Sequence, residues 1–478
     1  MSINELRFAD ATAQAAEIRS GTVSSRELTT AYLEAIESLD DALRSYVTTT
    51  SDLALDAADA ADERVRAAAD GDPLPPFLGV TTSFKDVVDV AGVATTHSCG
   101  LLADNVAAVD DPVVRRFRDA GFGVLGKTNV PEFCTSMTSS ALNGICRNPW
   151  DLEATPGGSS GGAAAALAAG LCAVAHGTDG AGSVRVPAAF CGVVGVKPTR
   201  GLFTLGPEAG TAYYGASEDG VLTRSVRDAA VMLDVMATGR WSPVPDGLHA
   251  DALHSAVTPL RVAVTADSPI GEVDPETAAA AHAAGDLLES LGHHVSLATP
   301  EWFTILTAAD GPGSVPGMAG LVGPDDVEML EPRNQRVWRM LAEMTVVDHA
   351  DWVDRARRAT REFCRFWDDI DVLVTPSCGI AAPSVGFAPW DQTSEEHMAT
   401  FMGFPNFGQA FNVSGQPALS LPLEMHSSGL PIGVQLVGRH LEEPTLLRLA
   451  AQLEEARPWI TRRPRGLEGL ESPRRTDG

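Results

Sequence analysis

Basic residues are scarce in this sequence. Its 478 residues include 35 lysines and arginines against 63 aspartates and glutamates, which gives a formal net charge of −28. Such a surface repels phosphate backbones and anionic lipid headgroups, so neither nucleic acid nor a membrane is an expected partner. Lysine is especially rare, because only Lys85, Lys127 and Lys197 occur. These positions are candidates for sites where arginine cannot replace lysine.

Signals for export and cross-linking are also missing. The first ten residues, MSINELRFAD, carry charges where a signal peptide would carry an apolar stretch. The longest apolar run, around residues 163–175, is alanine-rich and too short to span a bilayer. The seven cysteines are dispersed without a CxxC pair, which argues against a zinc cluster and a disulfide framework. We therefore expect a cytoplasmic protein.

Aromatic residues make up only 6% of the chain, but its 44% hydrophobic content is enough for a large core and excludes wholesale disorder. Residues 1–70 are predicted to form an N-terminal helical segment packed on the core, since apolar residues recur at helical spacing behind the capping box Ser24-x-x-Glu27. From residue 71 to 478, β-rich runs alternate with helical ones. This alternation predicts an α/β fold, with a large mixed sheet covered by helices on both faces.

Two stretches, residues 311–324 and the region around Trp390 to Phe407, are typical of long loops. Long ordered loops in enzymes often form lids or pocket walls. Variable substrate loops are therefore expected near residues 301–345 and 385–410.

Two glycine motifs suggest other chemistry. Residues 121–128 fit the phosphate-loop pattern GxxxxGK[ST], but a predicted helix precedes the glycines and Pro131 interrupts any helix after them, the reverse of the required order. Residues 158–162 fit the GxSxG nucleophile elbow of α/β-hydrolases, which needs a preceding strand where this chain has a proline-punctuated loop. The elbow remains an alternative, because downstream partners exist in Asp371 and in His397, His426 or His440.

Three segments favour a different chemistry. They are GVTTSFKD at residues 79–86, PGGSSGG at 156–162 and GTDGAGSVRVP at 177–187. Together they resemble the amidase signature family, serine hydrolases that use a Ser, cis-Ser, Lys triad. Supporting matches in GKTNVPEF, NPWD, DVLVTPS and FNVSGQPALSLP extend the resemblance over about residues 70–460.

The resemblance implies that Ser183 is the nucleophile, Ser159 a serine in a cis peptide and Lys85 the base. The chemistry agrees, because a buried lysine with a lowered pKa can accept a proton, whereas arginine stays charged at any working pH. Two alternatives stay open: Lys85 as a structural partner of Asp86, and residues 156–162 as a flexible loop that caps the following helix. Lys127 and Lys197 are expected to serve the fold.

The resemblance also assigns the residues around the nucleophile. Gly180, Ala181 and Gly182 would present backbone amides to the oxyanion. The spacing of Asp179 and Arg185 predicts an ion pair that supports the loop, a structural role favoured over substrate binding. The common family pattern has Thr-Gly-Gly or Ile-Gly-Gly at the oxyanion positions. This chain has Ala181 there, and similar alanine substitutions occur in the branch that resembles 6-aminohexanoate cyclic-dimer hydrolase.

The implied reaction is hydrolysis of a C–N acyl bond in a small amide through an acyl-enzyme, with no metal or organic cofactor. Cys134 would be a wall of the pocket by its family position. The loops are rich in residues that could line an apolar pocket, namely Trp302, Phe303, Met318, Trp390, Met398, Phe401, Met402, Phe404 and Phe407. Such a lining favours apolar or aryl amides, while carbamates and esters present the same kind of carbonyl.

Several readings of the function stay open. A nylon-oligomer (6-aminohexanoate) hydrolase is one alternative, and a catalytically dead binding protein on the same fold is another. The glutaminase subunit of a tRNA-dependent amidotransferase fits poorly with a charge of −28. The expected assembly is a monomer or a homodimer.

Overall fold

The computed structural model describes residues 1–69, 71–203, 215–237, 245, 247–256, 258–309 and 318–470. An eleven-stranded sheet runs through this part of the chain in the order β1-β3-β2-β6-β8-β7-β12-β13-β11-β9-β10. Its strands are β1 (Tyr46–Thr49), β2 (Thr81–Lys85), β3 (Gly123–Thr128), β6 (Val174–Asp179), β7 (Val194–Lys197), β8 (Glu218–Thr223), β9 (Arg261–Val264), β10 (His294–Leu297), β11 (Val372–Pro376), β12 (Ala418–Met425) and β13 (Pro431–Val437). A separate hairpin pairs β4 (Ser139–Ser140) with β5 (Gly144–Ile145).

The sheet is mixed. Strand β2 runs parallel to both β3 and β6, and β9 runs parallel to β10 and β11. The central strands from β6 to β11 pair antiparallel, as does β1 with β3. The predicted mixed α/β sheet is therefore confirmed.

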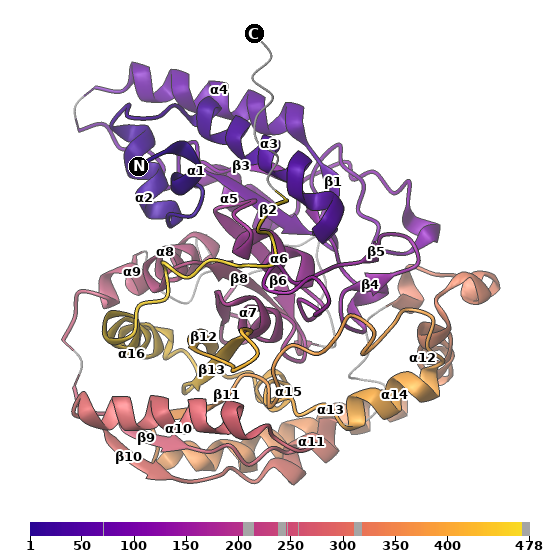
Figure 1. The fold of residues 1–478 in the computed structure, drawn as a ribbon. Helices are drawn as coiled ribbons and strands as arrows, with labels where there is room; N and C mark the ends of the chain where they lie inside the picture. The colour runs from indigo at the N-terminus through magenta and orange to yellow at the C-terminus, as the bar shows by residue number, and fades with distance from the viewer. Residues whose placement is uncertain are drawn as a thin grey trace.

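Helices cover both faces of this sheet (Figure 1). In chain order they are α1 (Ile3–Leu6), α2 (Ala11–Arg19), α3 (Ser25–Leu43), α4 (Ser51–Ala67), α5 (Pro112–Asp119), α6 (Gly161–Ala168), α7 (Arg185–Cys191), α8 (Val226–Ala237), α9 (Leu248–Ala252), α10 (Pro275–Ser290), α11 (Trp302–Ala309), α12 (Pro332–Glu343), α13 (Val346–Phe363), α14 (Ser394–Met402), α15 (Gln409–Ser414) and α16 (Glu443–Ala456). Helices α6 and α7 pack together against central strands, and α8 and α16 do the same elsewhere on the sheet. Within the described ranges, no helix combines the length and the apolar character needed to span a bilayer.

The N-terminal segment forms the predicted helices, and the capping box of Ser24 and Glu27 begins α3. It also contains a strand that the helical pattern did not predict. Strand β1 pairs with β3 at the edge of the sheet, and α4 packs on β3. This segment therefore contributes to the sheet as well as covering it.

The central helix α6 positions the glycine- and serine-rich segment before it. All eight of its residues are buried, and they are alanines and glycines except for one leucine. A Cβ added at Gly162 would lie 2.4 Å from the backbone nitrogen of Asn129, so the helix approaches its neighbours closer than a larger residue would allow. The apolar run of residues 163–175 is thus a core helix in its first part, and its last two residues begin strand β6.

The expected long loops are partly wrong. Helix α14 occupies the stretch around Trp390 to Phe407, and it begins at a capping box formed by Thr393 and Glu396. Residues 301–345 contain α11 and α12, with two short 3₁₀ turns between them at Met318–Gly320 and Pro324–Met329. Residues 310–317, which hold the glycine-rich part of the expected loop, lie outside the described residues.

The order of elements around residue 121 agrees with the sequence argument against a phosphate loop. Helix α5 precedes the glycines, β3 contains Gly126 and Lys127, and the short 3₁₀ turn Glu132–Cys134 follows. No α-helix begins directly after these glycines, so the strand, glycine loop and helix order of a phosphate loop is absent from these described residues.

Candidate active site

Lys85 ends strand β2 at the edge where the parallel strand β6 also ends. Its side chain is fully buried, and its Nζ lies 2.7 Å from Ser159 Oγ and 2.7 Å from Thr178 Oγ1. Burial lowers the pKa of Lys85 below its ordinary value of 10.5, because the charged ammonium loses its hydration. The lowered pKa makes the neutral amine, which can accept a proton, more accessible than it is for a lysine in water.

The alternative in which Lys85 is a structural partner of Asp86 is wrong. The carboxylate of Asp86 points to the other side of the strand and pairs with Lys127, with Nζ and Oδ1 3.0 Å apart and both side chains buried. Alternation along β2 explains the separation, since successive residues of a strand face opposite sides. Lys127 therefore has the structural role expected for it. Lys197 is also buried, and its Nζ donates to the carbonyl of Pro198 at 2.7 Å.

Ser159 follows a cis peptide bond, Gly158–Ser159, as the family resemblance implied. A Cβ added at Gly158 would lie 2.1 Å from the carbonyl oxygen of Ser136, so glycine is required at this close approach. The next residue ties the segment to the predicted nucleophile, because the backbone nitrogen of Ser160 donates to the carbonyl of Ser183 at 3.1 Å. Lys85, Ser159 and the Ser183 segment are thus brought together from three distant parts of the sequence.

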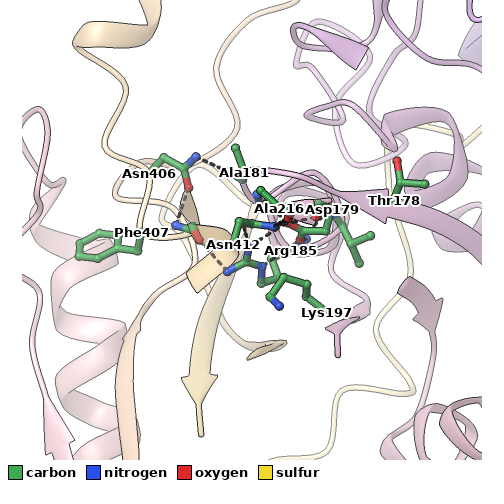
Figure 2. Close-up of polar contacts among 12 residues, drawn as sticks. Thr178, Asp179, Ala181, Arg185, Lys197, Ala216, Asn406, Phe407 and Asn412 are labelled. Atoms are coloured by element: carbon green, nitrogen blue, oxygen red, sulfur yellow. Dashed lines mark hydrogen bonds and ion pairs between the residues drawn. The ribbon is translucent and has the colours of Figure 1, made fainter. Parts of the chain in front are cut away.

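Asp179 and Arg185 form the predicted ion pair, with Oδ1 and Nη2 2.8 Å apart and both side chains buried. The guanidinium holds the pKa of Asp179 well below its usual range, although burial alone would raise it. Figure 2 shows Asn406 and Asn412 reaching this segment from the C-terminal part of the chain. Asn412 Nδ2 donates to the carbonyl of Asp179 at 2.7 Å, and Asn406 Nδ2 donates to that of Ala181 at 2.7 Å.

The predicted oxyanion amides are not equivalent. The backbone N–H of Gly182 donates to Asp179 Oδ1 at 2.7 Å, so the expectation that it serves the oxyanion is wrong for this arrangement. The side chain of Asp179 is the physical reason, since it turns back over the loop and also accepts from Val184. The amides of Ala181 and Ser183 donate to no other described residue. They remain candidates to bind an oxyanion, with Gly180 at the start of the turn.

A pocket of about 230 Å³ lies against this loop. Its lining includes Ser183, Ala181 and Cys134, as predicted, together with Gly158 and Val186. Cys134 stands in a turn where Phe133 and Cys134 both have positive φ values, 49° and 64°. The thiol of Cys134 raises the pKa of Lys85 against the larger effect of burial, which places this side chain beside the lysine.

The apolar lining expected from the loops is mostly wrong. Only Phe401 and Phe404 of the nine proposed residues line the pocket. Trp302, Met318 and Phe407 belong to buried clusters, and Phe303, Met398 and Met402 are largely exposed. Trp390 is half-buried outside the pocket lining. Figure 2 shows Phe407 pointing away from the loop of Asp179.

Sequence reasoning missed several polar residues of the site. Thr178 holds Lys85, and Arg333, Asn334, His397 and Asn406 line the pocket. Thr178 could have been found from its place one residue before Asp179 on a strand parallel to β2. The others lie far along the chain, and no motif marks them as pocket residues. Among them, His397 is a candidate from the sequence only as the histidine of a nucleophile elbow.

The nucleophile-elbow alternative finds no support in the described residues. No strand leads into residues 158–162, and the hydroxyl of Ser160 is bonded to the backbone of Thr178. The required acid and histidine have other partners. Asp371 pairs with Arg261, His397 bonds to the carbonyl of Thr135, His426 to Ser428 and His440 to the carbonyl of Ser414.

Comparisons with known proteins show the family of this chain. The sequence model of the Amidase family matches residues 27–308 and 326–447. A 6-aminohexanoate-cyclic-dimer hydrolase of Pseudomonas sp. (strain NK87) is 37% identical, over 95% of this chain and 96% of its own. An acylamidase of Rhodococcus erythropolis is 34% identical, over 97% and 98%. The solved structure of a 6-aminohexanoate cyclic dimer hydrolase complexed with substrate superimposes with a TM-score of 0.84 at 34% identity, over 96% of this chain and 99% of that one.

Fold and relatives together define a hydrolase that acts on amides. The chain belongs to the amidase signature family.

Proposed function

We propose that this enzyme hydrolyses the C–N bond of small amides through an acyl-enzyme on Ser183, with Ser159 and Lys85 as a proton relay. One observation carries the proposal: Lys85 Nζ lies 2.7 Å from Ser159 Oγ, beside a pocket lined by Ser183. A buried amine in that position can act as a base through a bridging hydroxyl.

Proton transfer and attack occur together in the first step. Ser183 Oγ attacks the substrate carbonyl, its proton passes to Ser159 Oγ, and the proton of Ser159 passes to Lys85 Nζ. Negative charge develops on the carbonyl oxygen, which the amides of Ala181 and Ser183 would stabilise. Asp179 contributes by holding the loop, since it engages Gly182 and Val184.

The second half reverses the proton path. Lys85 returns a proton through Ser159 to the leaving nitrogen, the C–N bond breaks and an amine departs. A water molecule then attacks the Ser183 ester and passes a proton through Ser159 to Lys85. The relay returns this proton to Ser183 Oγ as the bond between that oxygen and the acyl carbon breaks, and the carboxylic acid is released. Atoms and charges balance over the cycle without a cofactor.

Small substrates with apolar or aryl groups fit the pocket, because its volume is about 230 Å³ and Phe401, Phe404 and Val337 line it. Carbamates and esters offer the same carbonyl geometry to Ser183, so we include them as candidate substrates. Linear or cyclic 6-aminohexanoate oligomers are a second candidate class, supported by the 37% identity to a hydrolase of the cyclic dimer. The presence of Lys85, Ser159 and Ser183 argues against a dead binding protein.

A substrate panel tests the proposal. Purified enzyme would be incubated with aryl anilides, aliphatic amides, aryl carbamates, nitrophenyl esters and the 6-aminohexanoate cyclic dimer, with amine or phenol release measured for each. Cleavage of amides, aryl amides foremost, is the expected result. Cleavage of esters without any amide would overturn the amidase proposal.

The rate of amide cleavage should rise with pH through the lowered pKa of Lys85. The neutral amine is the active form, so the rising limb of kcat/KM is expected to have its midpoint below 10.5, the ordinary lysine value. Lys85→Arg keeps the positive charge but cannot accept a proton, so we expect it to lose activity by about 10³-fold or more. Stopped assays across a pH series measure both effects. A Lys85→Ala profile with an unchanged rising limb would contradict the role of base.

A further inference from the structure

The end of the pocket formed by helices α12 and α14 contains polar atoms without partners. Among the described lining residues, Asn334 and Asn406 have both ends of their amides bonded. By contrast, Arg333 Nε and Nη1, His397 Nδ1 and Ser136 Oγ are buried and make no hydrogen bond to any described residue. Buried polar groups without partners are unfavourable, so these atoms indicate that something else meets them.

Arg333 supplies unused donors. Its side chain is 0% exposed, and its Nη2 is occupied by the carbonyl of Ser139 at 2.7 Å and by Glu331 Oε2 at 2.6 Å. Nε and Nη1 of the same guanidinium are unoccupied. The guanidinium therefore offers N–H donors at the border of the pocket.

His397 supplies an acceptor. Its Nε2 lies 3.0 Å from the carbonyl oxygen of Thr135, and a carbonyl only accepts, so Nε2 carries the proton. Burial and the nearby charge of Arg333 lower the pKa of His397 to about 4, so the ring is neutral at neutral pH. Nδ1 then presents a lone pair, and it has no donor among the described residues.

Charge around Arg333 selects a neutral ligand. Glu331 already pairs with the guanidinium, Glu132 is buried nearby, and the exposed Asp391 also acts on it. Burial raises the pKa of Glu331 to about 7 and also raises that of Glu132, so a substrate carboxylate would bring a further acid into a group that already disfavours negative charge. A carbonyl oxygen needs only a donor, so it fits without that repulsion.

We propose that this end of the pocket binds a second, non-reacting amide group of the substrate, whose carbonyl oxygen accepts from Arg333 and whose N–H donates to Nδ1 of His397. The substrate class is then a molecule with two amide groups, one cleaved at Ser183 and one held at the far end. This inference rests on the proposed function, since it names the substrate of the same site.

Binding to a variant that cannot turn over tests this subsite without relying on catalysis. In a Ser183→Ala background, calorimetry would compare three matched series of anilides over a range of spacer lengths. The far end of each carries a secondary acetamide, an N-methylacetamide or an alkyl chain of equal length. At the best spacer, we expect the secondary amide to bind about fivefold tighter than the N-methyl amide, and the N-methyl amide about tenfold tighter than the alkyl chain.

Variants assign each contact. His397→Phe should abolish the difference between the secondary and the N-methyl amide, while His282→Phe, on the exposed face of α10, should leave it unchanged. Arg333→Met combined with Glu331→Gln removes both partners of the buried pair, and should abolish the preference for a carbonyl. Circular dichroism checks that each variant folds. If this double variant does not fold, the three probe series and His397→Phe still decide the matter.

Each result bears on one hypothesis. Equal binding of all three probes would overturn the subsite and indicate that bound water alone meets these atoms. A preference that persists in both pocket variants would overturn the assignment to Arg333 and His397. Hydrolysis of the same anilides by wild-type enzyme is scored separately: cleavage without a binding preference overturns only the subsite, and a binding preference without cleavage overturns only the amidase proposal.

Discussion

Replacement of Ser183 by alanine is expected to lower kcat/KM for an amide substrate by about 10⁴-fold or more. The variant keeps the pocket and the backbone amides but has no oxygen to form the acyl-enzyme. Its stability should be unchanged within about 0.5 kcal/mol, because the Ser183 hydroxyl bonds to no other described residue. Amine release and urea denaturation measure the two effects.

A matched serine controls for the loss of a hydroxyl. Ser290 lies at the end of α10, and among the described residues its hydroxyl bonds only to the nearby carbonyl of Leu287. The Ser290→Ala variant should therefore keep full activity. Full activity in Ser183→Ala would mean that the nucleophile lies elsewhere, and would return attention to Ser160.

Replacement of Arg185 by methionine is expected to destabilise the fold by about 3 to 5 kcal/mol. The change leaves the Asp179 carboxylate buried without its counter-ion, and it also removes bonds from the guanidinium to Asn412 at 2.6 Å and Gln435 at 2.7 Å. Activity should fall as well, since Asp179 orients the loop that contains Ser183. The free energy of unfolding in urea gives the magnitude.

The double variant Asp179→Asn with Arg185→Met separates charge from packing. Asparagine can still accept from the amide of Gly182 but carries no charge, so this variant should recover part of the stability lost in the single one. Equal stability of Arg185→Met and wild type would contradict the structural importance of the pair. No recovery in the double variant would mean that packing and the lost bonds to Asn412 and Gln435, not buried charge, dominate.

Much of this protein could be predicted from local patterns. The alternation after residue 71 predicted the mixed sheet, and the order of α5 and β3 excluded a phosphate loop. The segments of Lys85, Ser159 and Ser183 matched a known family over most of the chain, and the structure brings these segments together. Helix α14 was missed although its capping box was readable in Thr393 and Glu396, so that error belongs to the interpretation of the sequence.

Tertiary structure decided the partners of these residues. Alternation along β2 sends Lys85 and Asp86 to opposite sides, but only the sheet order places Thr178 beside the first and Lys127 beside the second. The Asp179 carboxylate folds back over its own loop and accepts a hydrogen bond from the amide of Gly182. No rule of sequence spacing predicts this contact. Arg333 and His397 reach the pocket from helices about 150 and 210 residues after Ser183. Their meeting depends on how α12 and α14 pack, because contacts between distant segments are set by the fold as a whole, whereas motifs and helix caps act within a few neighbouring residues.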